Sequence, residues 1–369
     1  MEEPDNRAII GRRAGYWRGV PSEEQKTGHD IVVIGASAGG VEALRAVVSR
    51  LPGDLPAAVF VVLHVPAIAT SVLPAILQRA GDLPADHAVD GAEIDRGRIY
   101  VAPPDHHLLV QPGFMRVNRG PKENGYRPAI DPMFRTAAAT YGSRVVGVIL
   151  SGVLDDGTAG LAAVKTHGGR ALAQDPADAL YPMMPTSAIA AAEPELVAPT
   201  AEIAEVIAQL AHEAVPATMA PTDDPLLDDE EYIEIDRAAS DRPQPGSPSG
   251  FVCPDCGGAL WESEDDKGLL RFRCRTGHGY SIETLAAEQT EIVESAVWSA
   301  LRALEERGAM ARRMASRLRS RGSKASAARF EAQADAAVQQ ALVIRDALQQ
   351  ITPLSDSAGQ LAHDAEIAS

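Results

Sequence analysis

Short apolar runs alternate with amphipathic stretches over residues 30–213, and this alternation predicts an α/β domain. Continuous apolar runs rich in β-branched side chains, typical of strands buried on both faces, occupy residues 31–34, 59–63 and 145–150. The stretch 41–51 places its apolar side chains at helical spacing and ends at a Pro-Gly pair. Strands alternating with helices indicate βαβ units, so we predict a doubly wound, mainly parallel sheet with helices on both faces.

Weaker patterns fill in the remaining elements of this domain. We expect helices over residues 71–77, 131–141 and 158–167, short strands over 98–102 and 171–173, and a hairpin over 108–117. The hairpin should turn at Pro112-Gly113, because this pair favours a tight turn.

After residue 281 the apolar pattern changes to a spacing of 3.5 residues, which predicts two long helices, each with an apolar seam. The first seam consists of Val297, Leu301, Leu304, Gly308, Ala311, Ala315 and Leu318. The second consists of Phe330, Ala334, Ala337, Ala341, Ile344, Leu348 and Ile351. A break at residues 320–323 favours an antiparallel helical hairpin. The alternative is an intermolecular coiled coil, which would make the protein a homo-oligomer.

Composition and charge divide the chain further. Residues 214–250 are rich in proline and hold 9 acidic against 2 basic side chains, a net −7 that indicates a linker. The predicted organisation is a flexible leader 1–29, a catalytic domain 30–213, this linker, a metal-binding module 251–280, the helices 281–352 and a tail 353–369.

The formal net charge of −17 argues against a nucleic-acid partner or an anionic membrane surface. We find no apolar run of about 18 residues that could span a bilayer, and the first 30 residues lack the apolar core of a secretory signal. We therefore expect a cytoplasmic protein without membrane insertion.

The segment Gly35-Ala-Ser-Ala-Gly39 follows the first buried strand and opens a helix. A dinucleotide fingerprint would need glycine where Ser37 stands, so that interpretation fails. The G-x-S-x-G pattern instead fits a nucleophilic serine on a tight strand-to-helix turn, beside N–H groups that can stabilise an oxyanion. The alternative is a serine that only caps the helix.

A base and a carboxylate follow two other predicted strands. His64 comes directly after the run 59–63, and Asp156 follows the run 145–150. Because the carboxyl ends of parallel strands share one edge of a sheet, Ser37, His64 and Asp156 should meet there as a Ser-His-Asp triad. Separately, each has an ordinary explanation, since His64 could be a loop histidine and Asp155 or Asp156 could cap the next helix.

At this point the sequence resembles a known family, the chemotaxis protein-glutamate methylesterases of the CheB type. The resemblance covers residues 30–213. It rests on Ile34-Gly-Ala-Ser-Ala-Gly-Gly40, Leu63-His-Val65, Tyr100-Val-Ala-Pro103 with Asp105 and His106, Arg127-Pro128 with Asp131, Val148-Ile-Leu-Ser-Gly152, Asp156-Gly157 and Leu172-Ala-Gln174. The family triad falls on Ser37, His64 and Asp156, and its fold is a doubly wound parallel sheet.

The resemblance implies hydrolysis of glutamyl methyl esters on methylated chemoreceptors or related signalling proteins. Some family members also deamidate glutamine. The oxyanion donors would be the backbone N–H groups of Ala38 and Val153. Two features depart from the family pattern: Ala38 stands where threonine is common, and Val153-Leu154-Asp155 replaces a glycine-rich segment. The receiver domain common at the family N-terminus has no counterpart in residues 1–29, so we expect a stand-alone form.

All three cysteines lie within 22 residues, at Cys253, Cys256 and Cys274, and His278 follows. The spacing C-x2-C-x17-C-x3-H gives two close ligand pairs, which is the donor arrangement of a structural zinc site in a ribbon-like module. The alternative is three buried thiols beside an ordinary histidine. The basic residues of this module are interspersed with acidic ones, so nucleic-acid binding is disfavoured. No cofactor is expected for catalysis.

Two classes of function remain open from the sequence. The first is a serine-dependent protein-glutamate methylesterase. The second is a non-catalytic signalling scaffold that binds a protein partner through the zinc module and the helices. His106 and His107 could contact substrate, but we expect them to be solvated. Arg127 could serve either the fold or an acidic substrate.

Overall fold

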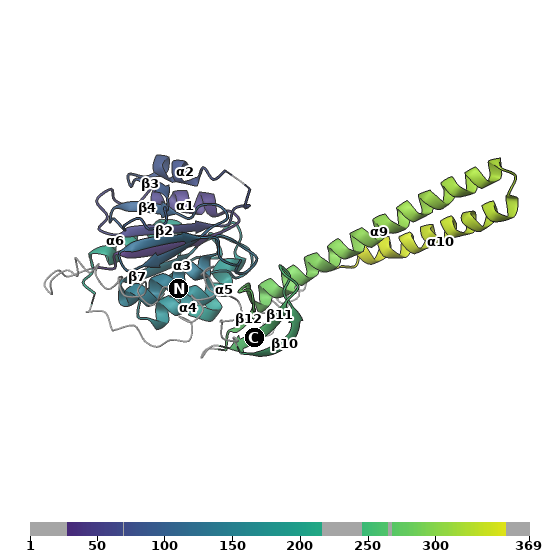
Figure 1. Ribbon diagram of the computed structural model, residues 1–369. Coiled ribbons are helices and arrows are strands. Elements are labelled where there is room, and N and C mark those ends of the chain that lie inside the picture. Colours follow the sequence, from purple (N-terminus) through teal and green to yellow (C-terminus); the bar gives the residue numbers. More distant parts are fainter. Residues whose placement is uncertain (1–27, 69, 216–245, 265–267, 352–369) are drawn as a thin grey trace, which may run out of the picture.

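A seven-stranded parallel sheet forms the centre of the first domain in the computed structural model, which describes residues 28–68, 70–215, 246–264 and 268–351 (Figure 1). The strand order is β3-β4-β2-β1-β7-β8-β9, and every neighbouring pair is parallel. The strands are β1 (Ile31–Ala36), β2 (Ala58–Leu63), β3 (Ala85–His87), β4 (Arg98–Val101), β7 (Val145–Ile149), β8 (Arg170–Gln174) and β9 (Leu196–Ala198). The predicted fold class is confirmed.

Helices cover both faces of this sheet. They are α1 (Gly40–Val48), α2 (Leu73–Ala80) and α6 (Thr200–His212) on one face, and α3 (Ile130–Tyr141), α4 (Thr158–Thr166) and α5 (Met183–Ala192) on the other. Strand β1 shows why its run is continuously apolar, because Val32 and Ile34 enter the first hydrophobic core while Ile31 and Val33 enter the second. The sheet is therefore buried on both sides, and its functional groups lie at its edge.

Several elements were not visible as patterns in the sequence. They are β3, β9, α5 and α6, together with a short 3-10 helix, η2 (Gly142–Arg144), after α3. Strands β3 and β9 have three residues each, too few to show a period. Helix α5 consists mostly of small and apolar residues on all sides, so it has no polar face that would mark it as amphipathic. The predicted hairpin is present as β5 (His107–Gln111) and β6 (Phe114–Asn118).

A small antiparallel sheet of four strands makes up the C-terminal module. Its strands are β10 (Ser247–Val252), β11 (Ala259–Glu264), β12 (Leu270–Cys274) and β13 (Gly279–Ser281), in that order. Strand β10 begins inside the segment predicted as linker, so the ordered module starts a few residues before 251. Residues 216–245 of the predicted linker, most of the leader and the whole of the tail 353–369 lie outside the described residues.

Two long helices follow the module and pack against each other as an antiparallel hairpin. Helix α9 (Ile282–Ser320) and helix α10 (Lys324–Leu348) project away from the sheet domain in Figure 1. Their contact buries small side chains from both predicted seams, including Ala311 and Ala337. Gly308 lies against Ala337, so the two backbones approach closely. Among the described residues, no helix combines the length and apolar character needed to cross a membrane.

Candidate active site

The loop after strand β1 carries Ser37 at the carboxyl edge of the sheet. The Ser37 N–H donates to the carbonyl of Ser151, which follows strand β7, at 2.9 Å. Gly39 then adopts φ +70° and begins helix α1. A Cβ at Gly39 would clash with Ser151 and Leu180, so only glycine fits this turn. The sheet and the glycine together place the half-buried Ser37 side chain at the helix N-terminus.

The structure brings the three predicted side chains into one hydrogen-bonded line. His64 lies directly after β2, and its Nδ1 is 3.0 Å from the Ser37 hydroxyl. Its Nε2 is 2.8 Å from Asp156 Oδ2. A proton on Nε2 donates to the Asp156 carboxylate and leaves the Nδ1 lone pair to accept from Ser37. The His64 and Asp156 side chains are only 4% and 1% exposed, so water does not compete for this contact.

Asp156 is held by the start of helix α3 as well as by His64. The Ile130 N–H donates to Asp156 Oδ2 at 2.7 Å, and the Asp131 N–H donates to Oδ1 at 3.3 Å. Burial alone would raise the pKa of Asp156, but the hydrogen bond and charge of His64 and the Ile130 N–H lower it below its ordinary value. The carboxylate is therefore kept ionised beside the imidazole.

Two contacts to this line were not foreseen from the sequence. The ring of Tyr126 stacks on the ring of His64, with centroids 3.7 Å apart and planes 6° apart. The side-chain amide of Asn124 donates to Asp156 Oδ1 at 2.8 Å. Both residues lie in the segment between β6 and α3, which shows no periodic pattern. The sequence offers two signals of a tight turn here. Asparagine tolerates positive φ, which is +51° at Asn124, and a glycine follows it.

Of the two predicted oxyanion donors, Ala38 directly follows Ser37 in the chain, and Val153 lies in the loop between strand β7 and helix α4. Gly152 packs against the Ser37 side chain, and Val153 follows it. The N–H groups of Ala38 and Val153 donate to no described residue. Leu154 adopts φ +61°, so leucine takes up a left-handed conformation in the segment where the family pattern has glycines.

Neighbouring polar residues take structural positions. Arg127 binds the Asp105 carboxylate at 2.6 Å and the Gly120 carbonyl at 2.7 Å, so it links two loop segments. His107 is fully buried and faces the Pro121 carbonyl, which corrects the expectation that it is solvated. Burial lowers its pKa to about 4, so it is neutral at pH 7. The Asp155 carboxylate does not cap α4 but accepts from Ser281 and Thr284.

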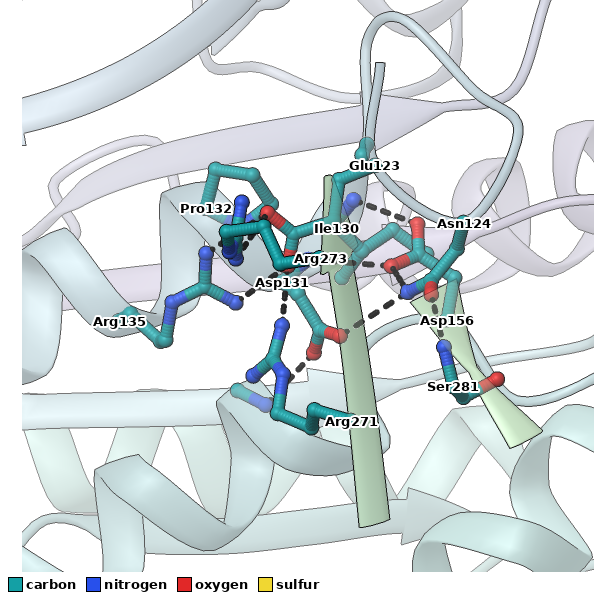
Figure 2. Close-up of polar contacts among 12 residues, drawn as sticks. Glu123, Asn124, Ile130, Asp131, Pro132, Arg135, Asp156, Arg271, Arg273 and Ser281 are labelled. Carbon is teal, nitrogen blue, oxygen red and sulfur yellow. Dashed lines mark hydrogen bonds and ion pairs between the residues drawn. The ribbon is translucent and has the colours of Figure 1, made fainter. Parts of the chain in front are cut away.

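A buried charge cluster joins the sheet domain to the C-terminal module (Figure 2). Glu123 accepts from Arg135 of helix α3 at 2.6 and 2.9 Å, and from Arg271 and Arg273 of strand β12. Burial alone would raise the pKa of Glu123, but Arg135 and the other two arginines lower it well below its ordinary value. A cavity of about 160 Å³ lies beside this cluster, and neither Ser37 nor His64 lines it.

The four predicted metal ligands of the module converge. The donor atoms of Cys253, Cys256, Cys274 and His278 all lie within 4.8 Å of one another. The Cys256 and Cys274 sulfurs are 3.8 Å apart, and His278 Nδ1 is 3.6 Å from Cys253 and 3.5 Å from Cys274. A tetrahedron with zinc–sulfur bonds of about 2.3 Å and a zinc–nitrogen bond of about 2.0 Å requires S···S of about 3.8 Å and S···N of about 3.5 Å. The ligand set therefore fits a tetrahedral metal ion.

Cys253 and Cys256 share one backbone turn, and Cys274 and His278 share another. The Gly257 N–H donates to the Cys253 carbonyl at 2.8 Å, and the Gly277 N–H donates to the Cys274 carbonyl at 2.9 Å. The Tyr280 hydroxyl, close to Cys253, donates to Asp255 at 2.6 Å. These turns bring the two donors of each pair close together.

Comparison with known proteins identifies what the sheet domain is similar to. A family model described as CheB methylesterase matches residues 32–207. A putative protein-glutamate methylesterase/protein-glutamine glutaminase of Leptospira interrogans is 36% identical over 183 residues, which cover 49% of this chain and 95% of that protein. A protein-glutamate methylesterase/protein-glutamine glutaminase of Paramagnetospirillum magneticum is 40% identical over 187 residues, which cover 49% of each chain.

Among solved structures, the CheB methylesterase catalytic domain of Thermotoga maritima is 37% identical, with a TM-score of 0.48, and the match covers 49% of this chain and 98% of that one. The chain spans about half the length of the first two curated relatives, those of Paramagnetospirillum magneticum and Rhodospirillum rubrum. All of these matches cover about half of this chain.

Proposed function

Because the chain belongs to the CheB methylesterase family, we propose that it is a serine-dependent carboxylic ester hydrolase that removes methyl groups from glutamyl esters of chemoreceptor-like signalling proteins. The observation that carries the proposal is the unbroken line from Ser37 through His64 to Asp156, with contacts of 3.0 and 2.8 Å. A serine held against an imidazole whose other nitrogen faces a buried carboxylate is the arrangement that activates a hydroxyl.

In the acylation step, Ser37 Oγ attacks the ester carbonyl and passes its proton to His64 Nδ1. The backbone N–H groups of Ala38 and Val153 stabilise the oxyanion of the tetrahedral intermediate. Asp156 holds the imidazole and offsets its positive charge. Collapse of the intermediate breaks the bond to the methoxy group, which takes the proton from Nδ1 and leaves as methanol.

Deacylation reverses these roles with water. His64 Nδ1 takes a proton from water, the hydroxide attacks the acyl carbonyl, and Ser37 leaves with the proton. The products are a glutamate side chain and free enzyme. The same steps on a glutamine side chain would release ammonia, which matches the second activity in the names of the relatives. Leu180, which packs beside Gly39 and is 69% exposed, offers an apolar contact for the substrate next to the nucleophile.

The test is methanol release from methylated receptor by the wild-type protein and by Ser37→Ala. We expect a loss of roughly 10⁴-fold or more, because triad members contribute by orders of magnitude. Ser49→Ala is the matched control, since Ser49 is exposed at the far end of helix α1 and should leave the rate unchanged. A loss of only a few-fold in Ser37→Ala would reject the nucleophile and favour the alternative of a non-catalytic scaffold.

We further propose that the metal of the module is Zn²⁺ in a structural role. Support comes from the three thiol donors and one imidazole, whose separations match a closed tetrahedron. The four ligands leave no open position for substrate, and the site belongs to a module with a very small apolar core. Zinc bound there would supply folding free energy to a module that buries little apolar surface.

Metal analysis of the purified full chain tests this assignment. We expect one zinc per chain in the wild-type protein and a marked loss in Cys256→Ser. The matched control is Ser263→Ala, a substitution of similar size on β11 of the same module that touches none of the four ligands. Unchanged zinc content in Cys256→Ser, or a metal other than zinc in the wild-type protein, would contradict the proposal.

A further inference from the structure

The turn formed by residues 123–126 lies between the C-terminal module and the triad. The Tyr126 N–H donates to the Glu123 carbonyl at 3.0 Å, and the Glu123 N–H donates back to the Tyr126 carbonyl at 3.2 Å, so the turn is closed on itself. Glu123 and Asn124 are 1% and 2% exposed. A shift of the turn on one side therefore also moves its contacts on the other side, because the segment is buried and closely packed.

On one side, the module holds Asn124 by two hydrogen bonds from strand β13. The Asn124 N–H donates to the Gly279 carbonyl at 2.8 Å. The Ser281 N–H donates to Asn124 Oδ1 at 2.9 Å. The adjacent Glu123 binds Arg271 and Arg273 of the module, and Glu288 of helix α9 packs against Gly125. The module and helix α9 thus contact three consecutive residues of the turn.

On the other side, the same turn touches two members of the triad. Asn124 Nδ2 donates to Asp156 Oδ1 at 2.8 Å and to Asp131 Oδ2 at 3.1 Å (Figure 2). Tyr126 stacks on the His64 ring. The orientation of the Asn124 amide follows from its partners, because a flipped amide would turn its oxygen toward two carboxylates and its NH₂ toward the N–H of Ser281. The Ser281 N–H therefore selects the orientation that serves Asp156.

The folding of the module is linked to its contact with Asn124 through the chain connection between His278 and strand β13. Strand β13 begins at Gly279, directly after the ligand His278. The loop from Cys274 to His278 leads into the strand that holds Asn124. A metal ion that fixes this loop would also fix the position from which Gly279 and Ser281 reach the turn.

We propose that the C-terminal module is a positioning element of the esterase, which holds Asp156 and His64 in line through Asn124 and Tyr126. Asn124 is a positioning residue, since it touches the carboxylate and never the substrate. This inference rests on the proposed function of the triad. Its consequence is that turnover depends on the docking and metal loading of a module that lies outside the residues matched by the family model and contributes no reacting atom.

The sharpest test compares Ser281→Pro with Ser281→Ala in the full-length protein. Both lose the Ser281 hydroxyl, which caps helix α9 and contacts Asp155, but only Ser281→Pro loses the N–H that holds Asn124. Ser281 has φ −72°, which proline can adopt. We expect kcat per active serine, titrated with a fluorophosphonate, to be roughly 10-fold lower in Ser281→Pro than in Ser281→Ala, with KM unchanged.

A second variant, Asn124→Gly, tests the proposal even if Ser281→Pro does not fold. Asn124→Gly retains the positive φ and leaves the module intact, so it should lower kcat at constant KM and constant zinc content. In the Asn124→Gly background, the further change Ser281→Pro should cost almost nothing beyond Ser281→Ala, because the bond it removes no longer exists. Additive losses in the double variant would overturn the proposal.

A readout independent of turnover is the downfield proton resonance of the His64–Asp156 hydrogen bond. We expect it to broaden or shift in Asn124→Gly and after zinc is stripped from the wild-type protein, and to return when Zn²⁺ is restored. An active wild-type enzyme whose kcat and resonance are unchanged in Asn124→Gly would refute the positioning role. An inactive wild-type protein whose resonance still responds would instead refute the esterase proposal and leave the coupling in place.

Discussion

The sheet domain and the C-terminal module are stabilised by different interactions. The sheet domain buries two large hydrophobic clusters, one on each face, built from side chains such as Val59, Phe60 and Phe134. The hydrophobic cluster of the module contains six buried residues, one of them Leu285 of helix α9, and two of the six are the predicted metal ligands Cys253 and Cys274. The first region folds by removing apolar surface from water, whereas the second depends on ligand chemistry and on buried ion pairs with its neighbour.

This difference shows how a small module can act on a large domain. The charge cluster lies where the two regions meet, and its central residue, Glu123, is the first residue of the turn that touches the triad. The sheet alone sets the backbone positions of Ser37 and His64, because both follow central strands, whereas the His64 ring also stacks on Tyr126 of the turn. Asp156 is held by residues of the sheet domain, but one of them, Asn124, is itself hydrogen-bonded to Ser281 of the module.

The largest effect is expected from Glu123→Gln. This change leaves three arginines without their carboxylate in a buried interface, so it should destabilise the docked module by about 3–5 kcal/mol. This loss of stability can be measured by urea unfolding and by hydrogen exchange of the backbone amides in strands β12 and β13. Glu305→Gln is the control, since its ion pair with Arg345 is about half exposed on both sides and should be worth less than about 1 kcal/mol. Equal effects of the two changes would mean that the charge cluster does not hold the regions together.

An intermediate effect concerns pH. Burial and the neighbouring Glu283 raise the pKa of Asp155 to about 7 in the folded protein, well above that of an unfolded aspartate. The stability that its protonation contributes is complete below about pH 4 and is lost as the pH rises toward 7. Between pH 4 and 7, the unfolding free energy of Asp155→Asn should therefore fall less than that of the wild-type protein.

Chemical denaturation at several pH values, with the exposed Asp346→Asn as a control, provides this measurement. Parallel pH curves for the wild-type protein and Asp155→Asn would contradict the assigned pKa. The comparison also separates the regions, because the two hydroxyl donors to Asp155 come from Ser281 and Thr284 of the C-terminal part.

The smallest effect is expected at Leu154, which lies entirely on the sheet side. Leucine at φ +61° costs about 1–2 kcal/mol in backbone strain, while glycine there would cost about 0.5–1 kcal/mol in chain entropy. Leu154→Gly should thus change the unfolding free energy by less than about 1.5 kcal/mol and leave kcat unchanged. Leu154→Val should destabilise, because a β-branched side chain tolerates positive φ poorly. If Leu154→Val were more stable than Leu154→Gly, the positive φ at this position would not strain the backbone.

Most of the sheet fold could be predicted from the sequence, because burial on two faces appears directly as continuous apolar runs such as 31–34 and 59–63. The meeting of Ser37, His64 and Asp156 followed from parallel strands that share one edge. The convergence of the three cysteines and His278 followed from ligand spacing.

The turn 123–126 could not be predicted in this way. Its functional contacts run to residues 157 positions away, such as the bond between Asn124 and Ser281, and no local period encodes them. Tyr126 and Asn124 lie in an irregular loop, and the arginines of β12 resemble an ordinary solvated face until the partner Glu123 is known. Long-range polar pairing is therefore the part of this molecule that requires coordinates.

The central claim, that Ser37 is a nucleophile activated by His64 and Asp156, is tested most directly by fluorophosphonate labelling followed by peptide mass spectrometry. We expect one label per chain, on the peptide that contains Ser37, and a labelling rate reduced by orders of magnitude in His64→Ala. A label on another serine, or equally fast labelling of Ser37 in His64→Ala, would contradict the account.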